Sequence, residues 1–165
     1  MATQRPSPFV GLTRAGLTVA VAAGLSRVFA DGAWPFAAVG AAAIPHAIIG
    51  YGDRRRWGAL VLLLALVVAG FGLSLYVVEV DTLRGVLPTG DTFRMYRDHL
   101  VDAPEILRAA VVPVAPVGSA LLLSLLSLFV AGAVAEWSAR RLDVTFGAVG
   151  PSLVVFVAVA ALGDG

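Results

Sequence analysis

The sequence contains no cysteine, no lysine and few charged residues of any kind. Without cysteine, the chain holds no thiol nucleophile, no disulfide and no Cys-ligated metal. Charged residues make up 14% of the 165 residues, whereas an average soluble domain carries about 25%. The sequence also lacks a phosphate-binding loop, an HExxH motif and a GxSxG motif. We therefore predict no catalytic residues, no metal site and no cofactor, and the short Arg clusters predict no nucleic-acid binding.

Apolar residues dominate what is present. The chain is 59% hydrophobic, and its mean hydropathy is +0.89. Continuous apolar runs of about 20 residues recur along the chain, which is the length needed to cross a bilayer as a helix. We predict an all-α fold: a polytopic helical membrane bundle that forms one domain over residues 1–165. About five spans are predicted, at 12–30, 35–51, 59–80, 117–137 and 144–163.

The arginines gather in the segment before the first predicted span and in the connections after the second and fourth. Positive residues in short loops favour the cytoplasmic side. All three groups share that side if the N-terminus is cytoplasmic, and the C-terminus is then extracytoplasmic. The stretch from Glu79 to Arg108, with six acidic residues against four Arg, falls outside. We thus predict a multi-pass protein of the cell membrane, in contact with the lipid bilayer.

The N-terminus allows one alternative. Residues 1–30 resemble a secretory signal, with an Arg-bearing start, an apolar stretch and "VFA" before Asp31. Arg27 argues against cleavage, because it lies where a cleavage region is neutral and small. Cleavage would leave the orientation of the other four spans unchanged.

The longest polar segment, 81–116, separates the third and fourth predicted spans. Within "PTGDTFRMYRDHLVDAPEILRAAVVPVAP", helical spacing places one set of apolar residues on a single face and charged residues elsewhere. The apolar set is Phe93, Tyr96, Leu100 and Leu107, and the charged residues include Arg94 and Arg97. Asp91 or Thr89 can cap the start. "DAPE" resembles a second helix start, so we predict two short amphipathic helices with a bend near Asp102.

Three roles are open for this segment. It can lie in the outer headgroup layer with its apolar face down, it can dock an extracytoplasmic domain, or His99 can act catalytically with nearby acids. No nucleophile or metal cluster accompanies His99 in the sequence, so the catalytic role has the least support. We expect Phe93, Tyr96, Leu100 and Leu107 to face lipid or the ends of the spans.

Ionisable residues inside predicted spans are candidates for function, because they are costly in lipid. The candidates are Arg27, His46 and Glu136. Arg27 and Asp31, like Glu136 and Arg140, are four residues apart and predict local ion pairs. For His46 we predict a hydrogen bond between helices.

The order "RVFADGAW", "LPTGDTFR", "AAVVPVAP" and "AEWSARRLDVTFGAVGPSLVVFVAVAALG" resembles the N-terminal membrane region of actinobacterial transglutaminase-like proteins of the TgpA type. The resemblance runs from about residue 15 to 163. In that family an extracytoplasmic transglutaminase-like domain with a Cys-His-Asp triad follows the membrane region, which implies that this chain is a fragment or a truncated reading frame. The resemblance also implies a membrane complex with a MoxR-type AAA+ ATPase.

Two main functions therefore remain open from the sequence. The first is a non-catalytic membrane-anchoring or interaction domain, which the resemblance implies. The alternative is a small transporter or channel subunit, which needs polar residues that converge at mid-membrane or broken helices. Gly147, Gly150 and Pro151 in the fifth predicted span favour the alternative. A membrane enzyme that uses His99 on a lipid-like substrate is a third option.

Overall fold

The computed structural model describes residues 34–85, 87–109 and 118–142, together with Gly16, Ala20, Ala23 and Gly150. Side chains at 80, 107–109 and 141–142 are outside this description. The predicted spans at 12–30 and 144–163 therefore lie outside the described residues, apart from those four single positions. So do Arg27, Asp31 and Pro151.

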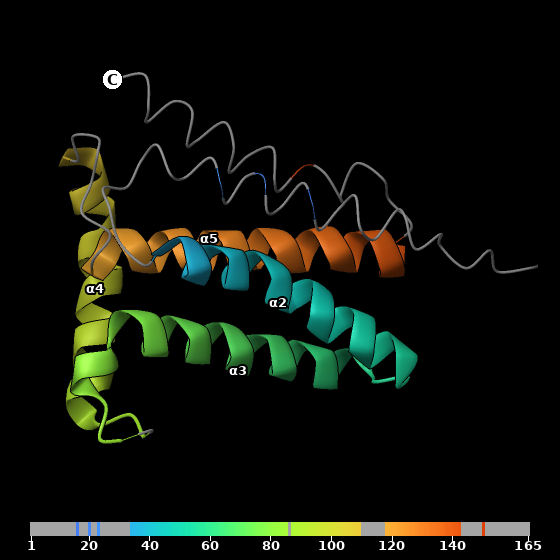
Figure 1. The fold of residues 1–165 in the computed structure, drawn as a ribbon, viewed down its shortest axis with the longest axis horizontal. Coiled ribbons are helices and arrows are strands. Elements are labelled where there is room, and N and C mark those ends of the chain that lie inside the picture. The colour runs from blue at the N-terminus through green and yellow to red at the C-terminus, as the bar shows by residue number, and fades with distance from the viewer. Residues whose placement is uncertain are drawn as a thin grey trace, which may run out of the picture.

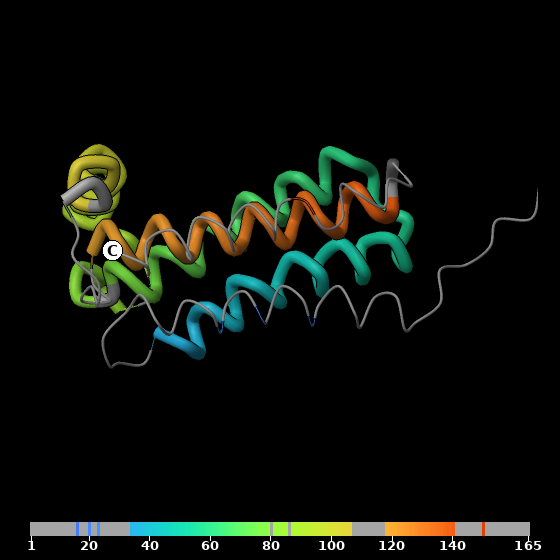
Figure 2. The backbone as a smooth tube through the Cα atoms, turned by 90° about the horizontal axis from the view of Figure 1, so that it is seen from above, coloured from blue at the N-terminus to red at the C-terminus, as the bar shows by residue number. Residues whose placement is uncertain are grey.

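The described part of the chain is helical. Its elements in order are α2 (Trp34–Arg54), α3 (Ala59–Val78), the 3-10 turn η2 (Val80–Thr82), α4 (Gly90–Ala109), α5 (Gly118–Trp137) and the π-helical turn η3 (Ser138–Leu142). Helices α2, α3 and α5 run side by side, and α4 crosses them at one end (Figure 1). From above, α4 is seen nearly end-on beside the other three (Figure 2).

Three of the described helices are long and apolar enough to cross a membrane: Trp34–Arg54, Ala59–Val78 and Gly118–Arg140. They coincide with the predicted spans at 35–51, 59–80 and 117–137, and each boundary differs by at most three residues from the prediction. The predicted all-helical fold is thus confirmed for this part of the chain, and three of its helices could cross a membrane by length and composition.

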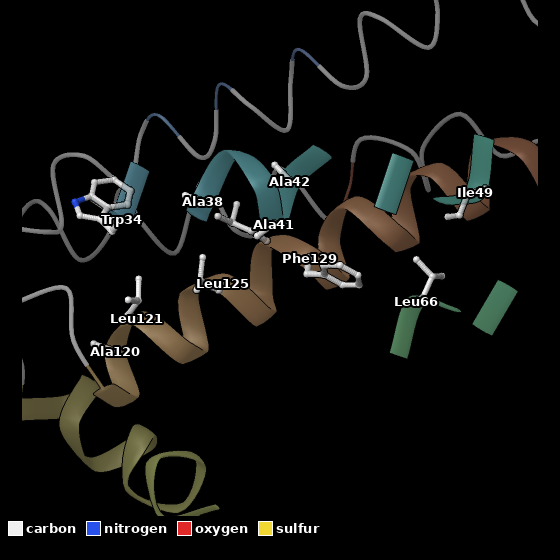
Figure 3. Packing of buried hydrophobic residues seen from close by; sticks show 11 residues of the cluster. Trp34, Ala38, Ala41, Ala42, Ile49, Leu66, Ala120, Leu121, Leu125 and Phe129 are labelled. Carbon is white, nitrogen blue, oxygen red and sulfur yellow. The ribbon is translucent and has the colours of Figure 1, made fainter. Parts of the chain in front are cut away.

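Helix α5 forms the centre of the described bundle. Of its span, 56% is buried, against 33% for α2 and 28% for α3. The buried residues of α2 recur every three or four positions and are mostly small, so the two backbones approach closely. A Cβ atom on Gly132 would lie 3.1 Å from the carbonyl oxygen of Ala42. Figure 3 shows the resulting seam, in which Ala38, Ala41 and Ala42 face Leu125 and Phe129.

Helix α3 contacts the bundle along one narrow stripe. Its buried residues Leu62, Leu66, Gly70 and Ser74 are each four positions apart and so share one face. Most of its remaining surface is large and apolar, including Leu60, Leu64 and Val68. A helix with an apolar surface all round suits a lipid environment, which explains how α3 remains stable with only one face packed.

The structure corrects the prediction of two short helices in the polar segment. Helix α4 is one helix from Gly90 to Ala109, and Pro104 lies inside it. Tyr96 and Ala103, on either side of the predicted bend at Asp102, are both buried on the same face. Because both residues pack on the bundle, the helix continues straight past Asp102, and no second helix begins there.

The start of α4 is capped as predicted by Thr89. The Thr92 backbone N–H donates to Thr89 Oγ1 at 3.3 Å, and the Thr89 N–H donates to Thr92 Oγ1 at 2.9 Å. This reciprocal pair satisfies two backbone donors, as in a capping box. Thr82 Oγ1 also donates to Thr92 Oγ1 at 2.9 Å, which ties η2 to the start of α4.

Candidate functional site

A buried polar cluster joins α2 to α5 within the spans. His46 Nδ1 on α2 donates to Glu136 Oε2 on α5 at 2.9 Å, and the other Glu136 oxygen accepts from Arg140 Nε one turn further on. The Glu136 side chain is only 3% exposed. A buried carboxylate is costly unless it is paired and hydrogen-bonded, and here both of its oxygens have donors.

The same cluster extends toward the end of α2. Arg140 Nη1 lies 3.6 Å from Asp53 Oδ2, and its guanidinium packs beside Gly50, where an added Cβ would make an ordinary 3.5 Å contact with Nη2. The chain of contacts thus runs from His46 through Glu136 and Arg140 to Asp53. It confirms the predicted interhelical hydrogen bond of His46 and the predicted Glu136–Arg140 pair.

A second polar cluster lies at the opposite end of the bundle, where α4 crosses α3 and α5. His99 Nε2 on α4 lies 3.2 Å from Glu79 Oε1, just after the end of α3. On its other side the imidazole accepts from the Ser119 hydroxyl, with 3.2 Å between Nδ1 and Oγ. The single residue His99 therefore contacts the C-cap of α3 and the first turn of α5.

Glu79 depends on that histidine. Its side chain is 1% exposed, yet Oε1 has no well-aligned hydrogen bond in the described structure. The Nε2–H of His99, 3.2 Å from Oε1, therefore stabilises the carboxylate by its N–H dipole, although the contact is not a well-aligned hydrogen bond. Gly118 makes the approach possible. Its φ is +54°, and a Cβ on it would lie 3.0 Å from His99 Cε1, so glycine suits this position on both counts.

The order Ser119–His99–Glu79 has the hydroxyl, imidazole and carboxylate of a nucleophile, a base and an orienting acid. However, Ser119 is 3% exposed, so its Oγ atom is closed to a substrate carbonyl in this conformation. The arrangement is suited to fixing α4 on the bundle rather than to acyl transfer.

Tyr96 supplies the third attachment of α4. Its hydroxyl lies 3.0 Å from Ser74 Oγ on α3, and Ser74 donates in turn to the Gly70 carbonyl at 2.9 Å. The Tyr96 ring meets Phe71 edge-on, with 5.1 Å between centroids. Phe93 stacks on the same Phe71 with centroids 5.9 Å apart.

The residues predicted for the amphipathic segment differ in how far they are buried. Tyr96 is buried on the span ends, as expected, whereas Phe93 and Leu100 keep 50% and 39% of their surface exposed at the edge of that contact. Arg94 and Arg97 point away from the bundle and are largely exposed. The side chain of Leu107 lies outside the described residues. Asp98 and Asp102 are exposed, so these two acids do not lie on the face of α4 that packs on the bundle.

Sequence reasoning missed the partners of His99. In the sequence Glu79 is one of six acids in a polar stretch, and Ser119 belongs to no motif. One hint was available, since Glu79 directly follows an apolar span and therefore lies where a buried acid requires a partner.

Among the described residues no group of three or more His, Asp or Glu side chains could hold a metal ion. Comparison of the chain with protein-family models, with curated proteins and with solved structures finds no match.

Proposed function

We propose that the chain is a non-catalytic membrane-anchoring and interaction domain that holds a charged helix at the membrane surface. One observation carries the proposal: α4 is attached across the ends of α3 and α5 by His99, Tyr96 and Thr92. Its opposite face, with Arg94, Arg97 and Asp98, stays exposed. A helix held this firmly offers a rigid surface to a partner outside the bilayer.

The finer architecture belongs to the same proposal. It has five spans, a cytoplasmic N-terminus and an extracytoplasmic C-terminus in the cell membrane, with α4 on the outer face. The Arg residues at 54–56 lie at the α2–α3 connection and Arg140 lies at the end of α5, both at the end of the bundle away from α4. That distribution supports a cytoplasmic location for this end.

The proposed partners follow from the resemblance to the N-terminal membrane region of TgpA-type proteins. They are an extracytoplasmic transglutaminase-like domain, which α4 would position, and a MoxR-type AAA+ ATPase on the cytoplasmic side. Sequencing the reading frame beyond codon 165 tests the first partner. A frame that ends there, or continues without a Cys-His-Asp domain, would remove the transglutaminase part of the proposal.

Single-cysteine labelling tests the platform itself, because the chain has no native cysteine. Arg97→Cys should react with a membrane-impermeant maleimide on intact cells, whereas Arg56→Cys should react only after the membrane is opened. Ala103→Cys, at a site 1% exposed, should stay unlabelled in both cases. Equal labelling of Arg97→Cys and Ala103→Cys would contradict a docked α4, and labelling of Arg56→Cys on intact cells would contradict the orientation.

A small transporter or channel subunit is the second candidate, favoured by the buried contacts among His46, Glu136 and Arg140. Ionisable groups at membrane depth often line ion or proton paths. In proteoliposomes with a pH gradient, this function predicts proton flux that Glu136→Gln abolishes and Asp102→Asn, on exposed α4, leaves intact. The anchoring proposal predicts no flux above empty vesicles for any of the three proteins.

A further inference from the structure

His99 lies where its imidazole is held on both sides by enclosed polar groups. Its Nε2 lies 3.2 Å from Oε1 of Glu79, at the end of α3, and its Nδ1 lies 3.2 Å from Oγ of Ser119, in the first turn of α5. Glu79 is 2% exposed and Ser119 3%. Both ring nitrogens therefore face a side chain that comes from outside α4.

The ring is confined but not sealed from water. A Cβ on Gly118 would lie 3.0 Å from Cε1 and 3.4 Å from Nδ1 of His99, so the imidazole packs directly against the backbone of that glycine. The His99 side chain nevertheless keeps 28% of its surface exposed. A proton can thus pass between solvent and the imidazole while the ring stays in place.

The two neighbours of His99 accommodate either charge state of the ring. A neutral imidazole donates its Nε2–H toward Glu79 and accepts at Nδ1 from the Ser119 hydroxyl. A protonated imidazole carries a hydrogen on both nitrogens, and the Ser119 hydroxyl then rotates to accept instead of donating. The ionised Glu79 carboxylate needs no adjustment, because it is an acceptor only.

We propose that His99 makes the attachment of α4 dependent on pH, so that the helix is held tightly at acidic pH and detaches more readily at alkaline pH. Histidine is the side chain that ordinarily changes its charge between pH 5 and 8. A protonated ring presents a full positive charge to the buried Glu79 carboxylate, whereas a neutral ring presents only the dipole of an N–H bond. Detachment of α4 separates the two groups, so the proton stabilises the docked state more than the detached state.

Attachment of α4 therefore weakens as the pH rises. At low pH His99 carries its proton in both the docked and the detached state, and the attraction to Glu79 contributes fully. As the pH increases the proton is lost, and that contribution disappears. Control of the platform by pH rests on the proposed anchoring function, but the attachment of α4 is measured without any partner protein.

Glu79 is the one buried charged side chain that faces His99 among the described residues. Helix α5 carries no ionisable residue before Glu136, which lies near its other end. The buried Tyr96 hydroxyl of α4 lies 3.0 Å from Ser74 Oγ. The other ionisable groups around α4 are exposed, and water screens them from His99: these are Tyr76 on α3, Asp81 and Arg84 in the connection, and the charged residues of α4 from 91 to 105.

Cysteine labelling across a pH series tests the proposal on the purified full chain in detergent. Ala103→Cys reports detachment, because that site is 1% exposed in the docked helix. Asp102→Cys is exposed whether or not α4 is docked, so dividing the Ala103→Cys rate by the Asp102→Cys rate at each pH corrects for the titration of the thiol itself. We expect this ratio to rise by about tenfold from pH 5.5 to pH 8, the difference between a charged and a neutral hydrogen-bond partner.

Two substitutions assign the effect to the pair. His99→Gln keeps an N–H donor beside Glu79 but does not titrate, so its ratio should be the same at every pH. Glu79→Gln leaves His99 without a carboxylate, so its ratio should no longer rise with pH. Far-UV circular dichroism at each pH confirms that the variants remain helical.

Three results would overturn the proposal. A ratio that stays low and constant from pH 5.5 to pH 8 with His99 and Glu79 both intact would exclude the pH dependence and leave a docked α4. A rise that persists in His99→Gln would assign the effect to another group, such as His46, the only other histidine. A ratio near one at every pH would instead contradict the docking of α4, and the anchoring function would fail with it.

Discussion

Glu79 and His99 form a pair that links the end of one membrane helix to the middle of another helix that crosses it. Glu79 Oε1 and His99 Nε2 are 3.2 Å apart, and the carboxylate is fully enclosed. Twenty residues separate the two along the chain, and the connection between them includes the Thr82–Thr92 contact. The pair fixes where α4 lies on the bundle, and the first prediction follows from it.

Replacement of His99 should release α4. In His99→Ala the buried Glu79 carboxylate loses its imidazole neighbour, at a cost of about 1–3 kcal/mol or more, since the group left behind is charged. We expect maleimide labelling of an added Ala103→Cys to rise, because that buried site opens when α4 detaches. Asp102→Cys, which is exposed in the docked helix, serves as the control and should label at the same rate with or without His99→Ala.

The double variant His99→Ala/Glu79→Gln completes this test. Removal of the charge on Glu79 should restore part of the protection of Ala103→Cys, because no unpaired carboxylate is then buried. If the double variant labels as fast as His99→Ala alone, the Glu79 charge is not what holds α4 in place.

Tyr96 and Ser74 should be coupled in a double-mutant cycle. Tyr96→Phe and Ser74→Ala each remove one partner of a buried hydrogen bond, which typically contributes about 0.5–1.5 kcal/mol. We expect a coupling energy of about 1 kcal/mol in the unfolding free energy measured in detergent. Tyr96→Ala should cost more, about 3–5 kcal/mol, because the Phe71 contact is lost as well. A coupling energy near zero would contradict the contact.

Glu136 and Arg140 give a second buried pair to test. Arg140→Met should destabilise the bundle by about 3–5 kcal/mol, since one oxygen of a buried carboxylate loses its charged donor. Adding Glu136→Gln should recover much of that loss, because the amide carries no charge and can still accept from His46. Thermal unfolding of the two variants separates these outcomes, and equal melting temperatures would argue against burial of the charge.

Gly132 lies where two helices approach closely, and Gly72 is a helical glycine in open space that serves as its control. Gly132→Ala places a Cβ about 3.1 Å from the Ala42 carbonyl oxygen of α2, so α2 and α5 must separate. We expect a loss of about 1–3 kcal/mol. Gly72→Ala meets nothing within 4 Å and should be neutral or stabilising by up to about 1 kcal/mol, because alanine favours the helix. A loss at Gly72 equal to that at Gly132 would exclude the close approach as the cause.

The spans and the local pairs could be predicted from the sequence. Continuous apolar runs fixed α3 to within two residues of its end, and the four-residue spacing of Glu136 and Arg140 was enough to predict their contact. The amphipathic pattern likewise identified Tyr96 as a buried residue of α4. Such features depend on short-range periodicity, which one sequence displays directly.

The contacts between distant segments could not be predicted in the same way. His99, Glu79 and Ser119 meet only because α4 crosses the bundle, and no periodicity in the sequence encodes that direction. The continuity of α4 through Pro104 has the same origin, since burial of Ala103 outweighs the local preference for a new helix start at Asp102. His46 was expected to bond a neighbouring helix, but which helix it would reach was not specified.

Helix α5 is restrained at both ends by different neighbours. Near its start Ser119 contacts His99 on α4, and near its end Glu136 contacts His46 on α2. A slide of α5 by one turn, about 5.4 Å along its axis, would break both contacts at once, and a rotation about that axis would also bring the small-residue seam out of alignment. Helix α5 is therefore locked in register from both ends, by α4 near its start and by α2 near its end.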